Sequence, residues 1–220
     1  SRIEKEYMGK NKGIPPDVHK KKYFKCSKCH TADEMHGDGN EYANRYEVKN
    51  APKCLDCHDT IYAADGENKE QHQQHKDRVS CQVCHAMPYK NCTSCHFGKD
   101  KQGLKYFKTQ ASTMDFKIGL NPLQCERRPE KYVTLRHVPV DQESFQFYVE
   151  NGLARFDALP TWKMATPHNI QRKTPQNASC NACHGQASLF LLEKDVVPKY
   201  LNANRTVIVA IDQVPAIVDQ

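Results

Sequence analysis

Five short stretches of the chain repeat one arrangement of reactive side chains, Cys-x-x-Cys-His, at residues 26–30, 54–58, 81–85, 92–96 and 180–184. Their thiols belong to Cys26, Cys29, Cys54, Cys57, Cys81, Cys84, Cys92, Cys95, Cys180 and Cys183. Their imidazoles belong to His30, His58, His85, His96 and His184. Ten of the 11 cysteines are used in this way, and the spacing is typical of covalent haem attachment.

The chemistry of attachment explains the order of residue types. Two thiols add across the two vinyl groups of one haem, and the adjacent imidazole reaches the iron as its proximal ligand. A zinc site would not need a histidine after each cysteine pair, and a thioredoxin-type motif would occur once. A disulfide framework gives no reason for the histidines. We therefore expect five covalently attached haem c groups.

Each iron also has a second axial position to fill. The histidines outside the motifs are His19, His36, His72, His75, His137 and His168. Five irons need five distal ligands, so the count favours bis-histidine binding at most of them, with one histidine left as a structural residue or as a ligand for another subunit. His72 and His75 would share one face of a helix and could serve two close haems. The five methionines are the alternative ligands, and core or surface roles are the more usual ones for them.

Composition points away from several other classes of protein. Only 38% of the residues are hydrophobic and the mean hydropathy is −0.80, which is low for burying a large core without a cofactor. The net charge is +6, but Lys and Arg are dispersed among acids, so no nucleic-acid partner is expected. Five ferric haems with about one negative charge each would bring the total to roughly +1. No apolar run has the length of a membrane span, and the opening residues lack an apolar leader, as in a processed chain.

The spacing of the motifs predicts one domain over residues 1–220, organised by its cofactors. It divides into a four-haem region (19–100), a motif-free insert with strands (101–179) and the fifth haem with a tail (180–220). The predicted fold class is mainly irregular backbone with short α-helices at the haem motifs and a minor β element. Alternating apolar residues predict a pair of strands at 131–138 and 144–150, joined by the PVDQ connection between them. A short helix is expected at 185–197 and a last strand at 206–211. Motifs starting at 81 and 92 should make their two haems neighbours.

The five motifs, with MHGDG at 35–39 and TPHNI at 166–170, resemble those of multihaem c-type cytochromes over residues 19–184. The resemblance implies a multihaem architecture built around a haem chain, and electron transfer in the periplasm or outside the cell. It also implies that His19 and His75, shortly before motifs, are distal ligands of neighbouring haems. The implied partners are other redox proteins or further copies of the chain, in a complex or a filament.

A multihaem reductase or oxidase of a small nitrogen or sulfur compound is the alternative interpretation. The nitrite reductases that the chain resembles replace one motif histidine with lysine, and Cys-x-x-Cys-Lys does not occur here. Two features favour an enzyme: the 83 residues between His96 and Cys180, and the odd thiol Cys125 beside Arg127 and Arg128, which could bind iron or attack sulfur. An electron carrier is favoured because the histidines suffice to fill both axial positions of every haem iron. No catalytic residue is therefore predicted.

Overall fold

The computed structural model describes residues 2–11, 13–88, 95–99, 102, 105–109, 116–138 and 149–219, with backbone only at residues 2, 95–99 and 105–109. Its helices are short. The α-helices are α1 (Arg2–Tyr7), α2 (Val18–Lys21), α3 (Cys26–Cys29), α4 (Ala32–His36), α5 (Lys69–His75), α6 (Cys81–His85) and α7 (Leu201–Asn204). The 3-10 turns are η1 (Cys54–Asp56), η2 (Asp59–Tyr62), η3 (Phe156–Ala158), η4 (Pro175–Asn177), η5 (Cys180–Ala182), η6 (Ala187–Leu189), η7 (Glu193–Asp195), η8 (Pro198–Tyr200) and η9 (Ile211–Gln213).

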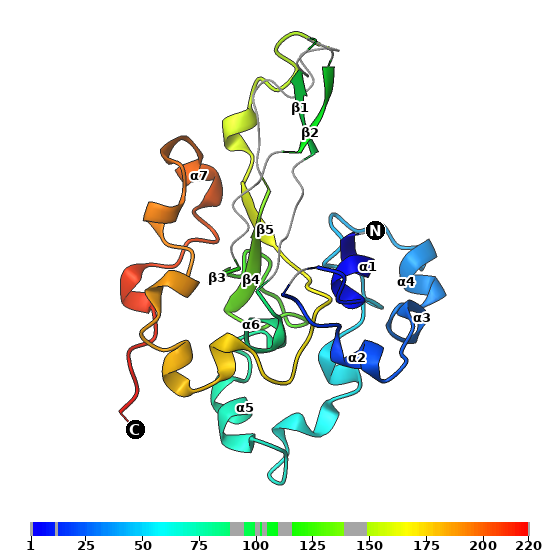
Figure 1. Cartoon of the computed structure of the whole chain (residues 1–220), viewed down its shortest axis with the longest axis vertical. Helices are drawn as coiled ribbons and strands as arrows, with labels where there is room; N and C mark the ends of the chain where they lie inside the picture. Colours follow the sequence, from blue (N-terminus) through cyan, green and yellow to red (C-terminus); the bar gives the residue numbers. More distant parts are fainter. Residues whose placement is uncertain are drawn as a thin grey trace.

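Two antiparallel sheets form the β structure. One has two strands, β1 (Cys95–Lys99) and β2 (Lys105–Thr109), and the other has the order β3 (Lys117–Leu120), β4 (Tyr132–His137), β5 (Trp162–Met164). In Figure 1, β3, β4 and β5 lie at the centre, with α6 beneath them, α1 to α4 on one side and α7 on the other. The central strand β4 covers most of the segment predicted as a strand at 131–138, but it pairs with β3 and β5. The second predicted strand, at 144–150, lies outside the described residues except for 149 and 150, which lie in a bend and a turn.

The conventional core lies around β3, β4 and β5. Val133, Leu135, Trp162 and Leu191 are buried in one cluster, and a second cluster packs Val83 and Ala86 of the 81–86 segment against Ile118 and Phe190. Gly119 is required where the 206–209 segment crosses β3, because a Cβ there would meet the Val207 carbonyl oxygen at 2.6 Å. The backbone N–H of Leu120 donates to that same oxygen at 3.0 Å.

Two expected elements take another form. The segment 185–197 contains the turns η6 and η7 in place of one helix. No strand forms at 206–211, where residues 206 and 207 lie in a turn, 208–210 belong to no element and Ile211 begins η9. The reason is a set of long-range bonds: Leu191 N–H donates to the Ile118 carbonyl at 2.8 Å, and Val209 N–H donates to the Leu191 carbonyl at 2.8 Å. Bonding to neighbouring segments at these positions replaces the intrahelical bonds that a helix over 185–197 would need.

The N-terminal region has no such core. All of residues 18–79 are described, and none of them is buried. A stretch of this length cannot offset its conformational entropy without burying apolar surface. The region therefore needs a further component to pack against.

Asn204 gives a test of the C-terminal core. Its fully buried side chain accepts from Trp162 N–H at 2.8 Å and donates to the Tyr200 carbonyl at 2.8 Å. We predict that Asn204→Ala lowers the free energy of unfolding by about 1–3 kcal/mol, because buried polar groups lose their partners. Thermal or denaturant unfolding followed by circular dichroism measures this change.

The matched control for that prediction is Asn202→Ala, which replaces an exposed asparagine two residues away. We expect this surface change to stay within about 0.5 kcal/mol of the parent protein. Equal losses of stability in the two variants would contradict the role assigned to Asn204.

Candidate haem-binding site

The described motifs are each built on a single helical turn. The cysteines lie on α3, η1, α6 and η5 or directly after them, so both thiols of a motif are presented from one turn. In the first, second and fifth motifs the histidine N–H donates to the carbonyl of the first cysteine, at 2.9, 3.0 and 2.9 Å. No disulfide joins the described cysteine side chains. In the fourth motif Cys92 lies outside the described residues, and Cys95 and His96 belong to β1 without described side chains.

Four of the motif histidines each face one histidine from outside the motifs. Numbered by motif, the pairs are site 1 (His30 and His168), site 2 (His58 and His19), site 3 (His85 and His72) and site 5 (His184 and His75). The ring centroids of each pair are 6.1 or 6.2 Å apart, while the angles between the ring planes range from 16° to 88°. A common distance at such different angles indicates a fixed spacing and not a preferred stacking contact.

That spacing matches the space needed for one metal ion between two imidazoles. Two metal–nitrogen bonds of about 2.0–2.1 Å on opposite sides of an ion, with the ring radii added, place the centroids about 6.3 Å apart. A haem iron takes such ligands above and below its ring. The four pairs therefore fit haem iron, with the two thiols of the motif beside one ligand of each pair.

In seven of the eight paired histidines, the ring nitrogen Nδ1 lies at hydrogen-bond distance from an oxygen atom. Among the motif histidines, Nδ1 of His30 lies 2.6 Å from the Glu34 carboxylate, that of His85 lies 3.1 Å from the Gln171 carbonyl, and that of His184 lies 3.0 Å from the Ala216 carbonyl. Among their partners, Nδ1 of His19 lies 2.8 Å from the Asp17 carboxylate. The other three partners use backbone carbonyls: Nδ1 of His72 lies 2.9 Å from that of Glu67, Nδ1 of His75 lies 2.6 Å from that of Gln71, and Nδ1 of His168 lies 2.9 Å from that of Thr166.

These contacts fix the tautomer of seven of the eight paired rings. Carbonyl and ionised carboxylate oxygens only accept, so Nδ1 carries the proton and donates it, which leaves the lone pair of Nε2 free for a metal. Burial lowers the pKa of His85, which favours the neutral ring that a metal requires. The hydrogen bond to Asp17 raises the pKa of His19. None of these acceptors follows from the motif itself, although Glu34 stands four residues after His30 and is the one that helical spacing could have revealed.

The thiols of different motifs adjoin one another. Contact with Cys81 raises the pKa of Cys54, joining the second and third motifs. Burial raises the pKa of Cys84 to about 12, and Cys183 of the fifth motif contributes to the shift. Burial raises the pKa of Cys29, and the Cys57 thiol makes a smaller contribution in the same direction. The thiols of the first and second motifs therefore lie near each other. The predicted closeness of the third and fourth motifs lies outside the described residues.

Two histidines stand apart from these sites. His36 ends α4 and is exposed. The His137 ring lies 5.1 Å from that of Trp162, its Nδ1 is buried without a hydrogen-bond partner, and burial lowers its pKa. Neither faces a motif histidine among the described side chains, which do not include that of His96.

Cys125 lies in an exposed turn closed by backbone bonds with Arg128. The neighbouring guanidinium groups are engaged elsewhere. Arg128 donates to the Tyr46 carbonyl at 3.1 Å, and Arg127 donates to the Ala51 carbonyl.

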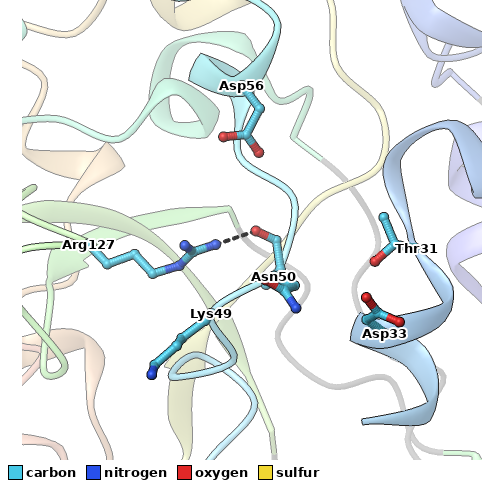
Figure 2. A pocket seen from close by; sticks show the side chains of 7 residues that line it. Thr31, Asp33, Lys49, Asn50, Asp56 and Arg127 are labelled. Atoms are coloured by element: carbon cyan, nitrogen blue, oxygen red, sulfur yellow. Dashed lines mark hydrogen bonds between the residues drawn. The ribbon is translucent and has the colours of Figure 1, made fainter. Parts of the chain in front are cut away.

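A polar cavity of about 430 Å³ lies between the first two motifs (Figure 2). Thr31, directly after His30, and Asp56, within the second motif, contribute to its wall. The cationic side chains of Lys49 and Arg127 lie in the same wall, with Asp33 opposite. The cavity therefore places two cations beside sites 1 and 2.

Comparison with known proteins gives one match. The family model described as "Cytochrome c554 and c-prime" matches residues 33–86, which include the second and third motifs with His72 and His75. The match supports a c-type cytochrome. No curated protein and no solved structure matches the chain. Haem c is the cofactor that this family implies, and haem-based electron transfer is the function it suggests.

The facing pairs make a spectroscopic prediction at site 1. Replacing His168 with Ala removes one of the two rings, so the iron held by His30 should lose an axial ligand and become high-spin. Low-temperature electron paramagnetic resonance of the purified oxidised protein measures the change, which we expect at one iron only.

Lys173→Ala is the matched control for that substitution, because Lys173 is an exposed residue on the same segment as His168 and belongs to none of the four pairs. Its spectrum should equal that of the parent protein. A His168→Ala spectrum that remained fully low-spin would contradict the assignment of His168 to the iron at site 1.

Proposed function

We propose that this chain is a pentahaem electron-transfer cytochrome in which most irons are bound by two histidines. The observation that carries the proposal is the common 6.1–6.2 Å spacing of the four histidine pairs. The haems, when bound, would supply one-electron redox centres. The haem of the fourth motif would be held by Cys92, Cys95 and His96, with His36 and His137 as the remaining candidates for its distal ligand.

In this proposal the two rings of a pair close the iron on both faces. Substrate binding to iron needs an open or weakly held position, and a pair of histidines with Nδ1 already hydrogen-bonded leaves none. The residues of sites 1, 2, 3 and 5 therefore favour electron transfer over catalysis. The reductase or oxidase alternative would need an open or cysteine-bound iron, and the guanidinium groups beside Cys125 are directed to backbone carbonyls.

The order of the irons along the chain is part of the proposal. The adjoining thiols join site 1 to site 2, site 2 to site 3, and site 3 to site 5. Shared segments support the same order, because α5 supplies His72 to site 3 and His75 to site 5. Cofactors attached at adjoining thiols would be close enough to exchange electrons in this sequence.

Residues around the sites would also hold the charged edge of the haems. Haem propionates are carboxylates, and Lys49 and Arg127 in the cavity between sites 1 and 2 are suitable cations for them. The +6 charge of the polypeptide would then compensate for propionates and is not needed for a nucleic-acid surface.

The proposed location is the periplasm or the exterior of the cell, as is typical of the matched family. No helix among the described residues is long and apolar enough to cross a membrane. The proposed partners are other redox proteins, or further copies of the chain in a complex or filament.

The experiment combines intact mass with low-temperature spectra of the purified protein. We predict a mass that exceeds that of the polypeptide by five haem groups, and a low-spin signal from at least the four irons of sites 1, 2, 3 and 5. Denaturing conditions should not release the cofactors, because thioether bonds hold them.

Two results would overturn parts of this proposal. A mass with fewer than five added groups would remove the pentahaem assignment. A high-spin iron that binds cyanide or nitrite in the unmodified protein would favour the reductase or oxidase alternative.

A further inference from the structure

The acceptors on Nδ1 differ in charge between the sites. At sites 1 and 2 one ring of each pair donates to a carboxylate, Glu34 for His30 and Asp17 for His19. At sites 3 and 5 both rings of each pair donate to backbone carbonyls. The chain therefore gives each of its first two sites one anionic acceptor and gives the other two sites neutral acceptors only.

Both carboxylates are held in place by their own local structure. Thr31 caps α4 by accepting from the Glu34 N–H at 3.3 Å, and the helix directs the Glu34 side chain back to His30. Asp17 caps α2, and its side chain is only 3% exposed. One Asp17 oxygen accepts from His19, and the other accepts from Ile170 N–H at 2.7 Å.

The second bond of Asp17 links sites 1 and 2. Ile170 is two residues from His168, the distal ring of site 1, while His19 belongs to site 2. One buried carboxylate therefore acts on a ligand of site 2 directly and holds the segment that carries a ligand of site 1.

A carboxylate acceptor changes the electronic character of a metal-bound imidazole. It draws the Nδ1 proton toward itself and makes Nε2 a stronger donor, which favours the more highly charged ferric ion. A hydrogen bond to an ionised group is about twice as strong as one between neutral groups. Exposed lysines near these sites act through water and are screened, whereas Glu34 and Asp17 touch the rings directly.

We propose that Glu34 and Asp17 make sites 1 and 2 the low-potential end of the haem chain, so that electrons run from these sites toward sites 3 and 5. This inference rests on the proposed electron-transfer function and adds a direction to it. Each step moves one electron from a ferrous iron at the donor site to a ferric iron at the acceptor site. No proton leaves the ring, because the Nδ1–H remains shared with its acceptor.

The test is a redox titration of the holoprotein, with each iron followed by low-temperature spectroscopy. Glu34→Gln should raise the reduction potential of the iron at site 1 alone, and Asp17→Asn that at site 2. We expect the ratio of reduced to oxidised iron at a fixed applied potential to rise about tenfold in each case, which corresponds to about 59 mV for one electron. His168→Ala and His19→Ala identify the spectral signals of the two irons.

The matched control is Asp38→Asn, which removes one negative charge from the same region. Asp38 accepts from the Tyr42 hydroxyl at 2.6 Å and from Asn40 N–H, not from a histidine. It should leave the site 1 and site 2 potentials close to those of the parent protein. If it raises them as much as Glu34→Gln and Asp17→Asn do, the direct hydrogen bond is not the cause.

The failure of this inference can be told from failure of the proposed function. Unchanged potentials in Glu34→Gln, with low-spin spectra retained, would overturn the gradient and leave the electron carrier standing. Parent potentials that are lower at sites 3 and 5 than at sites 1 and 2 would overturn the direction. Glu34→Gln decides the matter even if Asp17→Asn fails to fold, because Glu34 makes no bond that joins distant segments.

Discussion

The rest of this structure depends on a gap of 6.1–6.2 Å between paired imidazole rings. Each pair joins a histidine of a motif to one that lies outside the motifs. In the pair of His30 and His168, the two residues are far apart in the sequence. Two rings can keep such a distance only if both backbones are held, and in seven of the eight rings Nδ1 is held by a hydrogen bond as well.

The chain meets its stability requirement in two different ways. Around β3, β4 and β5 it buries apolar side chains in the usual manner, with Leu135, Leu191 and Val209 almost inaccessible to water. Over residues 18–79 it buries none. All four described sites draw ligands from that region, so bound haem would supply there both the apolar surface and the cross-links that the polypeptide lacks. The same cofactors would then act as redox centres and as the local core.

The groups behind the rings come from widely separated segments. Gln171 supports His85, and the chain near the C-terminus supports His184 through the Ala216 carbonyl. Gly185, with a φ of +74°, lets this segment approach closely, because a side chain there would collide with Ile217. The segment is further fixed by two bonds between Asn181 and Val218. Residues far from the motifs therefore set the orientation and donor strength of the motif ligands.

Local spacing is the basis for the predicted attachment residues, because all of the chemistry of one attachment lies within five consecutive positions. Alternation predicted the strand that the structure has at Tyr132–His137. His72 and His75 lie on one helix, α5, as their spacing allows, and their role as iron ligands stays a prediction. Which histidine faces which motif was decided only by the tertiary structure: His19 lies seven residues before the first motif, yet it faces His58 of the second. Loop closure costs little more for long segments than for short ones, so sequence distance does not select the partner. For the same reason the irregular path of 206–211 and the two turns within 185–197 depend on bonds to distant backbone, which no local pattern contains.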